Sequence, residues 1–256
     1  MKRVACLLGM FFWVKGKQGY KLSNDDKSTD YQSFLKETAF RKEDFYRQAF
    51  IEDCKSTRIK KEKVAIKNLE KIFEATFRIC TRKGFQGMTM RDLSTESGLS
   101  MGALYSYFAT KEELLNTLER VGNYQIGILL NESVARIKEP LDKLRVYIRT
   151  HLYISEMLQP WFFFSYMEAK NLAKREKEKY IQAELNTEKA IVDALNEGEK
   201  MGLLRHRDHQ LAASVIKAMI QDWYLKRGKY AKRGTTVEDY AITIIEWIES
   251  YYLQKT

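Results

Sequence analysis

Residues 89–111 read TMRDLSTESGLSMGALYSYFATK and predict two short helices joined by a tight turn. Thr89 can accept a hydrogen bond from a free backbone N–H group of the first helix while Asp92 reaches back, which is the capping-box pattern. Gly98 ends this helix because glycine adopts the positive φ of the turn at little cost. Ser100 can then cap the second helix, which we expect to run to Phe108. The pattern is typical of a helix-turn-helix, whose second helix enters the major groove of DNA.

Helix-forming residues dominate the rest of the chain. Its 256 residues include only two prolines and 13 glycines, so few positions interrupt a helix. Apolar residues at helical spacing predict helices over 58–84, 111–138, 141–158, 161–170, 173–200, 208–227 and 236–253. We therefore expect an all-α fold. A three-helix DNA-binding domain with the helix-turn-helix covers residues 58–115, and a six-helix ligand-binding and dimerisation domain covers residues 116–256.

Residues 1–57 form an extension ahead of these domains. Its apolar run at 4–14 is shorter than the roughly 20 residues that span a bilayer, and no small-residue cleavage site follows it. The run is either a poorly ordered or wrongly assigned extension, or a tail that contacts a membrane or the folded body. Residues 21–30 are polar and predict a linker, and residues 31–54 predict one or two amphipathic helices.

The positive charge is concentrated around the helix-turn-helix. Of the net charge of +10, residues 55–111 carry +7, with 12 Lys and Arg against 5 Asp and Glu. Cationic side chains at that place would meet the phosphates of DNA. A basic stretch alone is more often a solvated face, but its coincidence with a reading motif favours nucleic-acid binding.

Residues that would support catalysis or metal binding are scattered. The three histidines, His151, His206 and His209, do not have metal-ligand spacing, and the three cysteines do not form a CxxC pair. The sequence also lacks a nucleophile elbow and a glycine-rich phosphate loop. We therefore expect a protein that is not an enzyme and has no catalytic residue, metal or cofactor.

The most specific motif is LYSYFATKEELL at residues 104–115, which follows the glycine turn at a fixed distance. Other matching residues are Ile72, Ala75, Phe77, Gly84, Phe85, Met88, Thr89, Asp92, Leu93, Ser97, Gly98, Leu99, Ser100, Gly102 and Ala103. In these residues the stretch 69–115 resembles the DNA-binding domain of the TetR/AcrR family of bacterial transcriptional regulators. Two positions depart from the family, with Ser94 in place of the usual alanine and Ala103 in place of threonine or serine. The helices predicted after residue 111 also fit the family's ligand-binding domain.

Position and resemblance together assign the DNA contacts. In the family, the positions of Tyr107 and Lys111 bind phosphate, and Arg91 suits bidentate recognition of guanine. Tyr105 is either at the DNA or partly in the core, and Thr89 either binds phosphate or only caps its helix. The predicted DNA-binding residues are Thr89, Arg91, Ser100, Met101, Gly102, Ala103, Tyr105, Tyr107 and Lys111. The preceding lysines, Lys60, Lys61 and Lys63, either approach the DNA backbone or minor groove or form a solvated face.

A regulator of this kind needs a second site for its effector, and the aromatic run WFFFSY at residues 161–166 is the best candidate. Such a run is more often plain core, and His151 is more often a satisfied core histidine than a ligand. The predicted ligand-binding residues are Tyr147, His151, Met157, Trp161, Phe162, Phe164 and Tyr166. They indicate a small hydrophobic or aromatic effector, such as an acyl chain, an aromatic compound or a drug.

The last two helices, 208–227 and 236–253, have apolar faces that predict a homodimer with a four-helix interface. A symmetric dimer would recognise a palindromic operator in double-stranded DNA. The leading hypothesis is a cytoplasmic, ligand-responsive repressor that its effector releases from DNA. The alternative is a nucleoid or adaptor protein that is anchored on DNA and binds a protein partner through its helical C-terminal domain.

Overall fold

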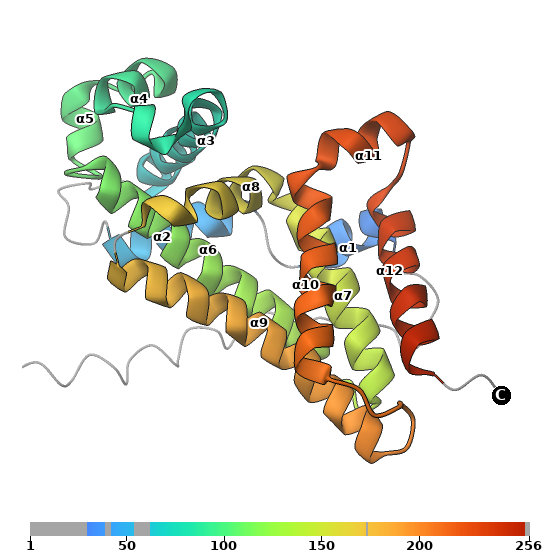
Figure 1. The fold of residues 1–256 in the computed structure, drawn as a ribbon. Coiled ribbons are helices and arrows are strands. Elements are labelled where there is room, and N and C mark those ends of the chain that lie inside the picture. The colour runs from blue at the N-terminus through green and yellow to red at the C-terminus, as the bar shows by residue number, and fades with distance from the viewer. Residues whose placement is uncertain (1–29, 39–41, 54–61, 173, 254–256) are drawn as a thin grey trace, which may run out of the picture. The chain divides into compact units, whose positions relative to one another are not determined.

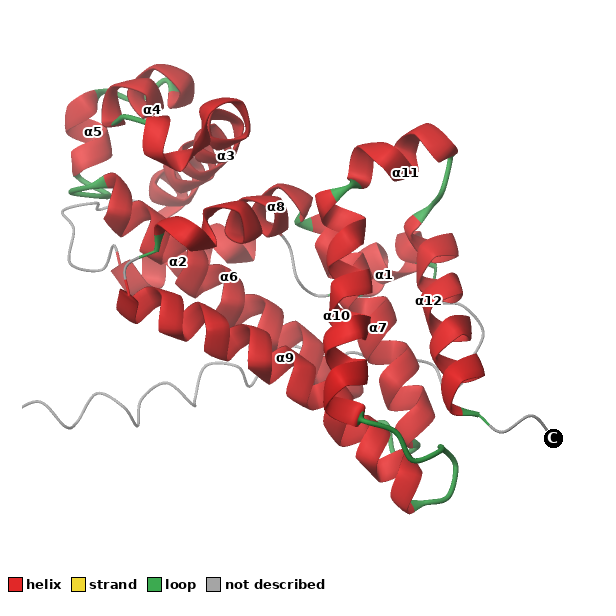
Figure 2. Cartoon of the chain, viewed as in Figure 1, coloured by secondary structure: helices red, strands yellow, loops and turns green. Residues whose placement is uncertain are grey.

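The computed structural model describes residues 30–38, 42–53, 62–172 and 174–253. All regular structure in these residues is helical, so the expected all-α class is confirmed (Figure 2). Two compact units divide the chain, Met1–Phe40 and Arg41–Thr256. Helix α1 (Tyr31–Glu37) belongs to the first unit, and all other described helices belong to the second.

The helix-turn-helix lies in a group of three helices (Figure 1). These are α3 (Glu62–Gly87), α4 (Met90–Ser97) and α5 (Met101–Tyr105). The predicted end of the first helix at Gly84 is confirmed as a break, because this residue has a φ of 71°. One further helical turn then leads to α4. Gly98 has a φ of 70° and ends α4, as the turn requires.

The six helices predicted after the motif are present, with slightly shifted ends. The structure has α6 (Lys111–Val134), α7 (Pro140–Met157), α8 (Gln159–Glu168), a 3-10 turn η2 (Ala169–Asn171), α9 (Lys174–Lys200), α10 (His209–Leu225), α11 (Arg227–Arg233) and α12 (Val237–Tyr252). The short helix α11 was not predicted, because two glycines in its neighbourhood favour a connector. Asp222 stabilises it by accepting hydrogen bonds from Lys229, at 2.8 Å, and from Tyr230.

Two helices are present in the segment 31–54, as the sequence predicts. The second, α2 (Lys42–Asp53), packs against α3 and α6. The buried ring of Phe45 lies 5.9 Å from the ring of Phe73 on α3 and 6.4 Å from that of Trp161 on α8. The apolar run at 4–14 lies outside the described residues. None of the described helices is both long enough and apolar enough to cross a membrane.

Helices α6 and α8 approach each other closely at Gly122. A Cβ atom at this position would lie 2.1 Å from the indole ring of Trp161, which no real contact allows. The same indole donates a hydrogen bond from Nε1 to the carbonyl of Leu118 at 3.0 Å. Glycine is therefore required here so that the indole ring can approach the helix closely and bond to its backbone.

Candidate nucleic-acid interface and ligand cavity

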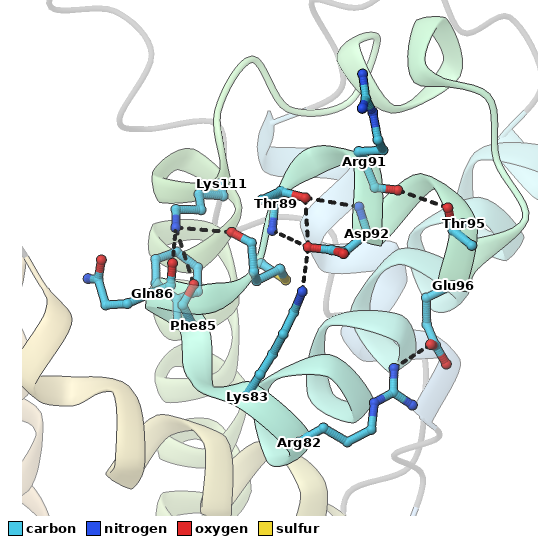
Figure 3. A network of polar contacts seen from close by, with 11 residues as sticks. Arg82, Lys83, Phe85, Gln86, Thr89, Arg91, Asp92, Thr95, Glu96 and Lys111 are labelled. Carbon is cyan, nitrogen blue, oxygen red and sulfur yellow. Dashed lines mark hydrogen bonds and ion pairs between the residues drawn. The ribbon is translucent and has the colours of Figure 1, made fainter.

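The start of α4 is held by the predicted capping box. The amide of Asp92 donates to Thr89 Oγ1 at 3.1 Å, and the amide of Thr89 donates to Asp92 Oδ2 at 2.8 Å (Figure 3). Lys83 Nζ lies 2.6 Å from the same carboxylate oxygen. The hydrogen bonds from Lys83 and Thr89 hold the pKa of Asp92 well below its usual range. Thr89 is thus a cap, and its contact with phosphate stays a prediction.

Two arginines of α3 bind α4 through one carboxylate. Glu96 accepts from Arg78 Nε at 2.8 Å and from Arg82 Nη2 at 2.5 Å. These hydrogen bonds hold the pKa of Glu96 below its usual value, with Arg82 as the largest cause. Two of the cationic side chains counted in residues 55–111 therefore form ion pairs within the domain. Arg91 is exposed, and its guanidinium points away from this network (Figure 3).

The recognition helix α5 is shorter than predicted. Ser100 caps it by accepting a hydrogen bond from the amide of Ala103 at 3.2 Å. It ends at Tyr105 and not at Phe108. Ser106 is its C-cap residue, and the hydroxyl of Ser106 donates to the carbonyl of Ala103 at 2.6 Å. The residues after the helix then form a turn that leads into α6.

The predicted DNA-binding side chains around α5 differ in exposure. Tyr105 is 52% exposed, so it is not part of the core. Gly102 is exposed, and Met101 and Ala103 are half-buried. Tyr107 is only 6% exposed, and its hydroxyl accepts a hydrogen bond from Asn68 Nδ2 at 3.0 Å. Its ring therefore packs in the domain, and a contact of its hydroxyl with phosphate stays a prediction.

Lys111 ties the end of α3 to the start of α6. Its Nζ donates to the carbonyls of Phe85, Gln86 and Met88 at 3.2, 3.0 and 3.1 Å (Figure 3). It also lies 5.0 Å from the centre of the Phe85 ring. Three carbonyls use all three donors of an ammonium. A phosphate contact from Lys111 stays a prediction, and it would require at least one of these bonds to be exchanged. Of the basic residues before the motif, Lys63 is exposed, and Lys60 and Lys61 lie outside the described residues.

A buried carboxylate joins the DNA-binding group to the rest of the second unit. Glu168 at the end of α8 is 4% exposed and accepts a hydrogen bond from the amide of Phe85 at 3.0 Å. Beside it, Gln86 Nε2 donates to Asn171 Oδ1 at 3.1 Å. No sequence pattern pointed to Glu168, because its partner lies 83 residues away in the chain.

A small cavity of about 30 Å³ lies between α6, α7, α8, α9 and α10. Four of the predicted ligand-binding residues line it: His151, Trp161, Phe162 and Tyr166. Three others do not. Tyr147 donates its hydroxyl to the carbonyl of Thr187, Met157 lines a neighbouring cavity, and Phe164 packs on Phe77. The lining residues that the sequence did not indicate include Tyr180, Glu184, Thr187, Lys217 and Tyr224.

Two basic side chains of this cavity, Lys217 and His151, are buried. Lys217 is 5% exposed and donates to Thr187 Oγ1 at 2.8 Å. Burial lowers the pKa of Lys217, and burial together with the charge of Lys217 holds the pKa of His151 well below its usual value. Nδ1 of His151 has no hydrogen-bond partner among the described residues, so this histidine is not the satisfied core residue that the sequence favoured. The sequence contains one signal for Lys217, because this charged residue lies within the mostly apolar segment 211–220.

Glu119 on α6 lies behind the cavity wall. Its Oε2 accepts a hydrogen bond from Ser165 at 2.7 Å, and its Oε1 is buried with no partner among the described residues. Burial raises the pKa of Glu119 to about 7.

In the part of the chain that the structure describes, His, Cys, Asp and Glu side chains form no group that could hold a metal ion.

Two family models match the chain. One, described as bacterial regulatory proteins of the tetR family, matches residues 72–118. The other, a tetracyclin repressor-like C-terminal domain, matches residues 138–244. The first therefore covers the helix-turn-helix, and the second covers most of the helices that enclose the cavity.

Curated relatives are also transcriptional regulators. The chain is 29% identical over 103 residues to the HTH-type transcriptional regulator PksA of Bacillus subtilis, a match of 39% of this chain and 50% of PksA. The chain thus spans about half the length of this relative. It is 25% identical over 165 residues to the HTH-type transcriptional repressor KstR2 of Mycobacterium tuberculosis, which covers 61% of this chain and 81% of KstR2.

Solved structures share the fold. The structure of KstR2 of Mycobacterium tuberculosis superposes with a TM-score of 0.65 at 18% identity, over 78% of this chain and 98% of that chain. AibR, solved with isovaleryl coenzyme A and operator DNA, superposes with a TM-score of 0.61 at 19% identity, over 70% of this chain and 96% of that chain. At these identities the likeness shows the fold alone.

Proposed function

Because the chain belongs to the TetR family of transcriptional regulators, which are not enzymes, we propose that it is a cytoplasmic repressor. It binds a palindromic operator as a homodimer, and a small hydrophobic or aromatic effector releases it. The relatives support this proposal, since KstR2 is a repressor and AibR has been solved with both operator DNA and an acyl coenzyme A.

The observation that carries the DNA-binding part is the braced helix-turn-helix. The capping box fixes the start of α4, the Glu96 bridge holds α4 on α3, and the Lys111 bonds tie the end of α3 to α6, while Arg91 and Tyr105 remain exposed. Rigid support with exposed arginine and aromatic side chains suits the reading of base edges and phosphates.

Selection from random duplex oligonucleotides tests this part. The expected product is a palindrome, bound at nanomolar concentration, and Arg91→Ala and Tyr105→Ala should each weaken binding at least tenfold. Lys189→Ala, at an exposed lysine of α9, is the matched control and should bind as the wild type does. Selection without any palindrome would favour the alternative, a DNA-anchored nucleoid or adaptor protein. Arg91→Ala and Tyr105→Ala are better tests than Tyr107→Ala or Lys111→Ala, because Tyr107 and Lys111 also make contacts within the domain.

The dimer part is supported by an apolar groove between α10 and α12. Its exposed side chains include Leu211 at 62%, Val215 at 52%, Trp247 at 69% and Tyr251 at 52%. Large apolar side chains gathered on one face indicate an interaction surface, and a second copy of the same pair of helices would cover it.

Native mass spectrometry tests the dimer. The wild type should be a dimer, and Trp247→Glu should be a monomer, because the variant would bury a carboxylate at the interface. Ile181→Glu replaces a side chain of 48% exposure on α9 and should leave the dimer intact. A monomeric wild type, or a dimeric Trp247→Glu, would contradict this assignment.

The effector part is supported by the contacts between the cavity and the DNA-binding group. Trp161 lines the cavity and bonds to α6, which begins directly after the helix-turn-helix. Glu168, at the other end of α8, bonds to the amide of Phe85. A ligand that displaces Trp161 would therefore act on both helices that lead to the DNA. An effector should lower the operator affinity, measured by fluorescence anisotropy, at least tenfold.

A further inference from the structure

The cavity contains two buried basic side chains whose hydrogen-bonding capacity is incompletely used. We propose that the effector is an organic acid. Its carboxylate binds the ammonium of Lys217 and the imidazole of His151, and its apolar body lies against the aromatic rings of the cavity. This inference rests on the proposed function, because it specifies the chemical class of the effector.

Lys217 is the first part of the carboxylate site. Its ammonium has three N–H donors. Thr187 Oγ1 takes one at 2.8 Å, and the Glu184 carboxylate lies at 3.5 Å, longer than a strong charge-assisted bond. Thr187 and Glu184 account for two of the three donors, so the third is left for an anionic acceptor, which would pair this buried ammonium more fully.

His151 is the second part. It is 1% exposed, it lines the same cavity, and its Nδ1 has no partner in the described part of the chain. A neutral imidazole carries one N–H, which can be on either ring nitrogen. A carboxylate has two oxygens and can accept from both groups at once, whereas a hydrocarbon ligand would leave both as they are.

The aromatic rings in the rest of the cavity wall determine which apolar part a ligand can have. The centre of the Phe162 ring lies 5.1 Å from the centre of the Trp161 ring and 5.0 Å from that of the Tyr224 ring. The three rings therefore form one apolar surface. The free space in the cavity is about 30 Å³, room for about two water molecules, so an acid can enter only when the surrounding rings move apart. An acid with a single ring or a short alkyl chain would require the smallest movement of these rings.

The alternative effector is an amine, because the carboxylate of Glu184 also lines the cavity and could bind a cation. Its oxygens already accept from Gln221 Nε2 at 2.9 Å and lie near Lys217, and its side chain is 31% exposed. Glu184 is therefore both paired and hydrated. The other carboxyl nearby, Glu119, is bonded to Ser165 and is not part of the cavity lining. Among the residues that line the cavity, His151 Nδ1 has no partner in the described part of the chain and Lys217 has an N–H donor left, which favours an acid.

Binding of matched probes to the full chain tests this inference without DNA. The probes are 3-phenylpropanoate and hexanoate, their neutral amides 3-phenylpropanamide and hexanamide, and the cation 3-phenylpropylamine. Isothermal titration at pH 7.5 should show at least one acid binding ten times more tightly than its own amide, with the amine weakest. The ring and chain probes distinguish an aromatic effector from an aliphatic one. An amide or amine that binds as tightly as the acid, or no binding of either acid at 10 mM, would overturn the proposal.

Substitutions in the cavity then test whether the carboxylate of the bound acid contacts Lys217. Lys217→Met keeps the length of the side chain and should reduce the preference for acid over amide to nearly one. Lys189→Met, at an exposed lysine of α9, is the control and should keep the preference. Circular dichroism checks that each variant folds. Should Lys217→Met not fold, Thr187→Val, which removes the hydroxyl that accepts from Lys217, should lower the preference several-fold. An unchanged preference in the folded variant would overturn the assignment.

The result is separable from that of the proposed function. Failure of the proposed function appears as the absence of sequence-specific DNA binding. Failure of this inference appears as normal DNA binding with no preference of the free protein for acids.

Discussion

Replacing Glu119 with glutamine should change how the stability of the protein depends on pH. Burial raises the pKa of Glu119 from 4.5 to about 7. Between these two values the folded protein holds the proton more tightly than the unfolded chain does. The free energy of unfolding therefore falls as the pH rises through this range, and the loss is complete above the folded pKa.

The size of the effect follows from the shift. One pKa unit corresponds to about 1.4 kcal/mol, so ionising the buried Glu119 costs about 3 kcal/mol at pH 8 relative to pH 4. Glu119→Gln cannot ionise, but its carbonyl can still accept from Ser165. Its stability relative to the wild type should therefore rise by about 3 kcal/mol from low to high pH. For a chain of this size that corresponds to roughly 6–12 °C in Tm.

Urea unfolding followed by circular dichroism between pH 4.5 and 8 measures this difference, at one fixed protein concentration because the stability of the proposed dimer would depend on it. Any constant cost of the new amide cancels in the difference between the two ends of the range. Glu112→Gln, at an exposed glutamate of the same helix, is the control and should parallel the wild type. Parallel curves for Glu119→Gln and the wild type would refute the assignment of a buried, proton-binding carboxyl.

Three further substitutions test contacts within the second unit, each by urea unfolding. Gly122→Ala should cost about 2 kcal/mol or more, because the new Cβ atom collides with the indole ring on α8, whereas Gly127→Ala, where no atom lies within 4 Å, should cost nothing. Glu168→Ala should cost about 1–3 kcal/mol and speed the hydrogen exchange of the Phe85 amide, because that buried N–H loses its acceptor; unchanged exchange would contradict the bond. Phe45→Ala should cost about 3–5 kcal/mol, and a loss below 1 kcal/mol would mean that α2 is not part of the core.

Local features of the fold were predictable from sequence. The capping box at Thr89, the glycine turn at Gly98 and the proline at the start of α7 each depend on residues within a few positions of one another. A helix end is decided by such neighbours, so the sequence alone reveals it. Helix α11 was missed for the opposite reason, because its stability comes from Asp222 and from packing outside its own seven residues.

The candidate sites were only partly predictable. Aromatic residues of one segment, Trp161 and Phe162, were found, because a run of rings is visible in sequence. The polar half of the cavity was missed, since Glu184 and Lys217 come from two other helices and meet only in the folded chain. Lys111 shows the same limit in the DNA-binding group. Its position predicts a phosphate ligand, but its contacts with three carbonyls depend on how α3 ends.

The packing of α2 has a consequence for how this protein can be divided. The residues matched by the family begin at position 72, yet Phe45 lies against both the helix-turn-helix group and the helix that lines the cavity. Grafting the matched segments alone onto another regulator would expose the ring of Phe73 and one side of Trp161. The exchangeable module in this chain therefore starts at α2, and chimaeras should be cut before residue 42.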